Sequence, residues 1–154
     1  MTVQPFLIGS GWQITRDGDP SGRAIFERHY SAASALARRR RRQTKLYVGP
    51  GFKLVLLWPD ARALFIWRKE RERADGQVGV NCAVFRNEGA GVASELILAA
   101  EAEAWNRWPA ERLFTFVDPR RVRGNPPSNC FYRAGWRRCG TSAGGLHILE
   151  KVPA

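Results

Sequence analysis

The order of apolar and polar positions predicts several short strands. Residues 53–58 and 63–67 are apolar runs, and Pro-Asp-Ala-Arg at positions 59–62 separates them. Proline presets the first turn angle and aspartate can bond the backbone beyond it, so this segment predicts a hairpin. Residues 78–85 alternate in the way that a central strand does, and residues 113–117 and 145–152 predict two further strands.

Helical spacing of apolar residues appears in two regions. Residues 23–43 are rich in helix formers and predict one helix, or two, ending in a run of arginines. Residues 93–108 predict a second helix, which Pro109 ends. Its apolar stripe is Ile97, Ala100, Ala104 and Trp108, while Glu95, Glu101 and Glu103 lie elsewhere on the helix.

These elements predict one α+β domain over residues 1–154. Residues 1–22 are rich in glycine and are expected to be irregular, with at most one strand at residues 11–15. The remainder predicts a mostly antiparallel mixed sheet flanked by helices. The helix at residues 93–108 crosses between two parallel strands, residues 78–85 and residues 113–117, in the usual right-handed connection.

The charge of the chain favours a polyanionic partner. Lys and Arg number 25 against 14 Asp and Glu, which gives a formal charge of +11. Residues 28–59 and 119–149 contain no acid at all. A solvated surface tuned for solubility is the alternative, but unbalanced charge costs self-repulsion, and nucleic acid is the better candidate. The candidate phosphate contacts are Arg38, Arg39, Arg40, Arg41, Arg42, Lys45, Arg120, Arg121 and Arg123.

The cysteines and the lengths of the apolar runs indicate the cellular compartment. Cys82, Cys130 and Cys139 are an odd number without a C-x-x-C pair, so neither a disulfide framework nor a zinc ribbon is indicated. The apolar runs are far too short to cross a bilayer. We expect a soluble protein in the reducing cytoplasm, with no membrane partner and with the oligomeric state open.

A candidate phosphate-binding loop joins the strand at residues 78–85 to the helix at residues 93–108. Its Arg86-Asn87-Glu88-Gly89-Ala90-Gly91 has R-x-x-G-x-G spacing, which is similar to the pyrophosphate signature of GNAT acyltransferases. In that signature backbone N–H groups and a helix N-terminus approach the phosphates. The resemblance implies an acyl-coenzyme A donor bound by Arg86, Gly89, Gly91 and Ser94. The alternatives are a flexible loop, and a first-turn or cap role for Ser94.

A second resemblance lies in the C-terminal third. Val-Asp-Pro at 117–119 precedes Asn-Pro at 125–126, Cys-Phe at 130–131 and Ala-Gly-Trp at 134–136. This order resembles the C-terminal half of a GNAT fold and the Mom family of phage DNA modification proteins. Phe131 stands where ordinary GNAT enzymes carry a tyrosine general acid, and Tyr132 is the neighbouring candidate. Asp118 is a candidate to accept or orient a proton, or simply to cap its Asp-Pro turn.

The pair His29-Tyr30 is similar to a pair that the Mom family carries near its N-terminal helix. In that family the pair is implicated in activity and in binding iron, so the resemblance implies catalytic and metal-binding roles for His29 and Tyr30. On residues alone, a single histidine on a partly apolar helix is more often packed and hydrogen-bonded than a ligand.

The Mom resemblance implies an enzyme that places a methylcarbamoyl group, derived from an acyl donor, on the exocyclic amine of adenine in double-stranded DNA and so protects the DNA from restriction. A conventional GNAT N-acetyltransferase acting on a small amine or peptide is the first rival. A basic DNA-binding protein that has kept the fold without catalysis is the second.

Overall fold

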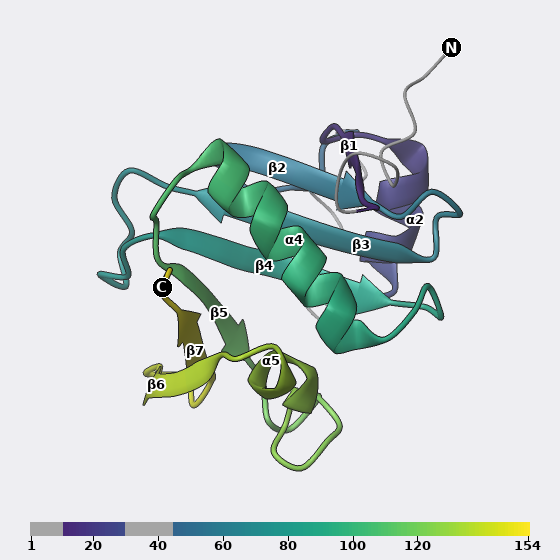
Figure 1. The fold of residues 1–154 in the computed structure, drawn as a ribbon. Helices are drawn as coiled ribbons and strands as arrows, with labels where there is room; N and C mark the ends of the chain where they lie inside the picture. The colour runs from purple at the N-terminus through teal and green to yellow at the C-terminus, as the bar shows by residue number, and fades with distance from the viewer. Residues whose placement is uncertain (1–10, 30–44) are drawn as a thin grey trace.

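The computed structural model describes residues 11–29 and 45–154. Seven strands form one sheet in the order β1-β2-β3-β4-β5-β7-β6, with helices on its faces (Figure 1). Neighbouring strands run antiparallel except β4 and β5, which are parallel. The strands are β1 (Gln13–Thr15), β2 (Phe52–Leu57), β3 (Ala63–Lys69), β4 (Val80–Asn87), β5 (Leu113–Val117), β6 (Arg137–Thr141) and β7 (His147–Lys151). This mixed, mostly antiparallel sheet with helices on its faces confirms the predicted α+β fold.

The hairpin predicted around positions 59–62 is confirmed. β2 and β3 pair in register from Leu57 opposite Leu64 onward. The carboxylate of Asp60 accepts a hydrogen bond from the Arg62 N–H at 3.0 Å, which is the local role expected of aspartate in such a turn.

The first helix, α2 (Pro20–Glu27), begins earlier than the predicted residue 23. Asp19 explains the difference, because its carboxylate caps the helix by accepting a hydrogen bond from the Gly22 N–H at 2.8 Å. Pro20 then occupies the first turn, where a missing N–H costs nothing. The predicted continuation through the arginine run lies outside the described residues.

Strand β4 contains a β-bulge. Ile66 of β3 lies opposite Val84, but the next residue, Trp67, lies opposite Cys82, so Ala83 is an additional residue in β4. A bulge of this kind bends a strand and increases its twist. The parallel pairing of β4 with β5 covers three residue pairs and ends at Cys82 opposite Thr115. Beyond that pair the two strands diverge (Figure 1).

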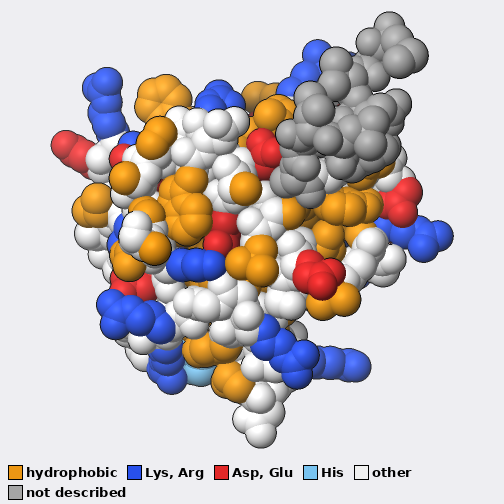
Figure 2. Space-filling view, in the orientation of Figure 1, with side chains coloured by type: hydrophobic (Ala, Val, Ile, Leu, Met, Phe, Trp, Pro, Cys, Tyr) orange, Lys and Arg blue, Asp and Glu red, His pale blue; other side chains and the backbone are white. Residues whose placement is uncertain are grey.

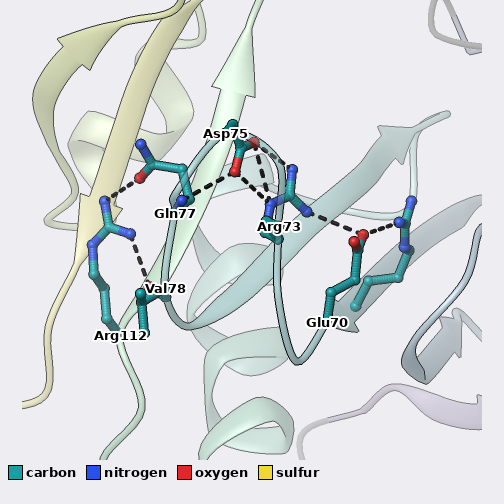
Figure 3. Close-up of polar contacts among 7 residues, drawn as sticks. Glu70, Arg73, Asp75, Gln77, Val78 and Arg112 are labelled. Atoms are coloured by element: carbon teal, nitrogen blue, oxygen red, sulfur yellow. Dashed lines mark hydrogen bonds and ion pairs between the residues drawn. The ribbon is translucent and has the colours of Figure 1, made fainter.

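The start of β4 differs from the predicted residue 78. Val78 is exposed, and the strand begins at Val80. The Arg112 guanidinium donates to the Val78 carbonyl oxygen at 3.0 Å and to Gln77 Oε1 at 3.1 Å, so these residues belong to a loop (Figure 3). Gly79 has φ +123°, and an added Cβ there would lie 2.2 Å from the Arg112 carbonyl oxygen.

Helix α4 (Ala93–Arg107) crosses one face of the sheet from the end of β4 to the start of β5 (Figure 1). Three buried tryptophans hold it in place through their ring N–H groups. Trp12 donates to the Leu96 carbonyl oxygen and Trp67 to the Ala100 carbonyl oxygen, each at 3.0 Å. Trp136 donates to the Glu101 carboxylate at 2.8 Å. These bonds come from three distant parts of the chain and fix the rotation of α4 about its axis.

Glu101 was expected away from the buried stripe of α4, but it is 2% exposed. Besides Trp136, its carboxylate pairs with the Lys151 ammonium group at 2.6 Å. Lys151 also donates to the Ala134 carbonyl oxygen at 2.7 Å. A buried carboxylate is tolerable when its lone pairs are satisfied in this way. The pair therefore joins α4 to β7 and to the end of α5 (Asn129–Arg133).

The opposite face of the sheet has its own core. Ile25 and Phe26 of α2 pack there against Tyr47 and against strand residues that include Leu64 and Ile66. Further along, the guanidinium groups of Arg73 and Arg112 lie 5.2 Å and 5.0 Å from the ring centroid of the buried Phe114. Figure 3 shows how Arg73 is held by Glu70 and Asp75. The loop between β3 and β4 thus covers this end of the sheet.

We predict that Glu101→Ala lowers the free energy of unfolding by about 3 kcal/mol, because it leaves the Lys151 charge and the Trp136 N–H without their buried acceptor. Urea unfolding measures the change. Glu95→Ala is the control in the exposed first turn of α4, and it should cost less than about 1 kcal/mol. Equal unfolding midpoints for the two variants would show that the buried pair contributes nothing.

Candidate functional site

The divergence of β4 and β5 opens a cavity of about 580 Å³. Ligand pockets typically have volumes of this order. Cys82 and Thr115 line it at the last paired positions, where the Thr115 hydroxyl donates to the Cys82 carbonyl oxygen at 2.9 Å. Val84 and Phe131 add apolar lining. The cavity is thus mainly apolar where the strands meet. Its polar lining includes Arg86 and Asn87 at the end of β4 and Arg121 and Arg123 in the loop after β5.

The N-terminus of α4 lies at one side of this cavity, where Ala93 is a lining residue. The N-cap position is Val92, which offers no side-chain hydrogen bond. The first N–H groups of a helix have no partner within it. Together with the helix dipole they form a natural site for an anion. Ser94 is a first-turn residue rather than the cap.

The loop that carries the R-x-x-G-x-G spacing lies between β4 and α4, as predicted. Gly89 has φ +94°, which favours glycine. However, Asn87 Oδ1 accepts hydrogen bonds from the N–H groups of Gly89 at 3.2 Å and Ala90 at 2.9 Å. Asn87 Nδ2 donates to the Gly91 carbonyl oxygen at 2.8 Å. The loop therefore satisfies part of its own backbone, and two N–H groups expected to be unpaired have partners.

Arg86 lines the cavity, and an acidic neighbour holds it. The Nε of Arg86 donates to Glu88 Oε2 at 2.6 Å. Arg28, just beyond α2, donates to both oxygens of the same carboxylate at 2.7 Å and 2.6 Å. Hydrogen bonds from Arg28, and then from Arg86, lower the pKa of Glu88 to about 2. Glu88 is therefore ionised throughout the physiological range.

His29 is a cavity-lining residue, as its candidate role requires. Burial, and then the charge of Arg86, lower its pKa to about 4, although a hydrogen bond with the Phe85 backbone opposes this shift. The imidazole is consequently neutral near pH 7. Its predicted partner, Tyr30, lies outside the described residues.

Asp118 follows β5 beside the cavity and is held by its own turn. Its carboxylate accepts hydrogen bonds from the backbone N–H and the Nε of Arg120, both at 3.0 Å. Arg121 Nε lies 3.7 Å away. The bonds from Arg120 lower the pKa of Asp118. This arrangement matches the turn-capping alternative, because the carboxylate already accepts hydrogen bonds within its own turn.

The short helix α5 closes the cavity opposite β4. Cys130 and Phe131 line the cavity, and burial raises the pKa of the Cys130 thiol. Phe131 packs edge-on against Trp136, with ring centroids 4.9 Å apart. Tyr132 is partly buried against the core that α4 covers. Phe131 thus belongs both to the cavity lining and to the buried core, whereas Tyr132 packs against that core and is not among the lining residues.

The predicted basic contacts are divided in space. Arg120, Arg121, Arg123 and Lys45 are all exposed, and of these Arg121 and Arg123 also line the cavity. Figure 2 shows Lys and Arg side chains around the lower end of the view, where α5 and β6 lie. Acidic side chains stand among the basic ones elsewhere on that face. The run Arg38 to Arg42 lies outside the described residues.

The resemblance implied an iron site at His29 and Tyr30, and Tyr30 lies outside the described residues. Within residues 11–29 and 45–154, no three His, Cys, Asp or Glu residues are grouped as a metal site would need. Over the same ranges, no helix combines the length and the apolar character needed to cross a bilayer.

Several residues at the site carried little sequence signal. Asn87 and Glu88 fill the two unspecified positions of the R-x-x-G-x-G motif, so the motif assigned them no role. Asn87 offered the one available signal, because asparagine and aspartate in turns often hydrogen-bond the backbone two residues ahead. Cys82 and Thr115 read as ordinary strand positions, and only the sheet register brings them together.

The chain resembles a solved structure, but no known family. No protein-family model matches the chain, and no curated protein matches it. A protein from Bordetella pertussis, described as a GNAT-family acetyltransferase whose activity is unproven, has a similar structure with a TM-score of 0.48 and 18% sequence identity. The likeness covers 90% of this chain and 98% of that one.

We predict that His29 makes stability depend on pH between about 7 and 5. The unfolded residue titrates near 6.5 and the folded one near 4, so the unfolded chain binds more protons in this interval. The free energy of unfolding should fall by about 1 to 2 kcal/mol on going from pH 7 to pH 5, and His29→Gln should remove most of that fall. Urea unfolding at both pH values measures it. An unchanged pH dependence in the variant would contradict the buried, neutral imidazole.

Proposed function

We propose that this chain is a transferase that carries an acyl-derived group, a methylcarbamoyl group in the case of a Mom-type enzyme, from a coenzyme A type donor to the exocyclic amine of adenine in double-stranded DNA. The observation that carries the proposal is the distribution of donors around one cavity. The N-terminus of α4 and Arg86 stand on one side, and Arg121 and Arg123 line it as well. Two anionic partners can thus approach the same apolar space.

The donor side fits the phosphates of a coenzyme A. The first-turn N–H groups of α4 and the Arg86 guanidinium are the kinds of group that bind phosphate. The apolar strip between β4 and β5 suits a pantetheine arm. A thioester at its end would supply the activated acyl carbon, and its C–S bond would break to release the coenzyme A thiolate as the C–N bond to the amine forms. Asn87 occupies the Gly89 and Ala90 N–H groups, so phosphate binding falls mainly to α4 and Arg86.

The acceptor side fits a nucleic acid. An adenine amine is a poor nucleophile and is buried in the base stack, so the base has to be flipped into a pocket while its flanking phosphates are held. Arg121 and Arg123 would hold the phosphates. His29, neutral at pH 7 and lining the cavity, would take the proton that leaves the amine. Asp118 would orient Arg120 and Arg121 rather than act as the base.

The test is mass spectrometry of nucleosides from plasmid DNA of a bacterial host that expresses the chain. We predict a new adenine adduct, and its loss with His29→Gln while thermal stability at pH 7 and DNA affinity remain nearly unchanged. DNA without an adduct, together with acetylation of a small amine by the purified chain, would favour the conventional acetyltransferase. A variant with normal modification would leave His29 a packing role only.

We predict that Arg121→Ser/Arg123→Ser lowers DNA affinity for all sequences alike and reduces the slope of log affinity against log salt by about 1 to 2. Arg71→Ser/Arg107→Ser is the control. It removes the same charge from exposed positions, one in the loop after β3 and one at the far end of α4. Equal slopes for the two variants would mean that the cavity arginines do not contact phosphate.

A further inference from the structure

The carboxylate of Glu88 lies between two guanidinium groups at the edge of the cavity. Its Oε2 accepts from Arg86 Nε at 2.6 Å and from Arg28 Nε at 2.7 Å, while its Oε1 accepts from Arg28 Nη2 at 2.6 Å. Paired arginines that donate to the oxygens of one anion are the arrangement in which proteins bind phosphate. The Glu88 carboxylate therefore occupies a position between Arg28 and Arg86 that would also suit the oxygens of a bound phosphate.

The position of Glu88 is built into the fold. Its backbone N–H donates to the Arg62 carbonyl oxygen at 2.6 Å, which ties it to the β2–β3 turn. The Glu88 side chain is 22% exposed, and those of Arg86 and Arg28 are 35% and 50% exposed. The ion pairs are thus solvent-accessible, and ion pairs of this kind contribute little net stability. A partly exposed carboxylate that contributes little to stability can be displaced by a stronger anion.

We propose that Glu88 is an internal competitor for phosphate, which a donor phosphate must displace from Arg86 and Arg28 in order to bind. The proposal rests on the proposed donor site and adds its regulation. Glu88 lowers the affinity of the loop for every phosphate-bearing ligand. It leaves ligands without phosphate unaffected, because they gain nothing from the released guanidinium groups. The loop then selects among ligands by the charge of their phosphate groups as well as by their shape.

The test compares Glu88→Gln with the parent chain in calorimetric titrations with coenzyme A, pantetheine and inorganic pyrophosphate. Glutamine keeps the size of the side chain and removes the charge that competes with phosphate. We expect the dissociation constants of coenzyme A and pyrophosphate to fall about fivefold, and that of pantetheine to stay within about twofold. Arg86→Met/Glu88→Gln should lose most of the gain, since Arg86 would receive the phosphate.

Glu95→Gln is the matched control, because it removes one negative charge from the first turn of α4. A change of less than about twofold is expected there, since an exposed charge is screened by salt. Equal or weaker binding of both phosphate ligands by Glu88→Gln would overturn the proposal and would mean that Glu88 only positions Arg86. An equal gain from Glu95→Gln would overturn it as well. Tighter pyrophosphate binding without any coenzyme A binding would support the competition and contradict the proposed donor.

Discussion

The bulge at Ala83 is the constraint on which the site depends. It ends the parallel pairing of β4 and β5 after three residue pairs, and the strands separate beyond it. A regular parallel ladder would have continued the hydrogen bonds and left no space between the strands. A bulge leaves a residue unpaired and increases local twist. In this chain the bulge separates β4 from β5 beyond Cys82. The space between the two strands is the cavity, and residues of the surrounding loops add polar groups to its lining.

The position of α4 relative to the cavity is fixed, because hydrogen bonds and an ion pair prevent the helix from rotating or sliding. Trp12, Trp67 and Trp136 donate to Leu96, Ala100 and Glu101 of the helix. The buried Glu101–Lys151 pair ties the helix to β7. A helix held in this way keeps its N-terminus at the end of β4. Its unpaired N–H groups then face the cavity without any ligand-induced ordering. The proposed anion site and the stability of the core therefore depend on the same helix.

Much of the fold followed from local pattern, and much of the site did not. The hairpin, the strand Leu113–Val117 and the helix α4 were predicted closely, since alternation, turn residues and helical spacing act over a few positions. The burial of Glu101 was not predicted, because its partners lie 35 and 50 residues away. The pairing of Glu88 with Arg28 spans 60 residues. Such contacts depend on sheet register and helix rotation, neither of which the spacing of residues reveals. The glycine motif gave the location of the loop but not the internal bonds of Asn87.

The proposed function requires that the first turn of α4 and the adjoining loop receive a phosphate-bearing donor. Amide hydrogen exchange with and without coenzyme A tests it. The N–H groups of Ala93 and Ser94 should become protected, because a phosphate would supply the acceptors that the helix lacks. Gly89 and Ala90, already bonded to Asn87, should change less. Unchanged exchange throughout residues 86–94 at saturating coenzyme A would contradict the account.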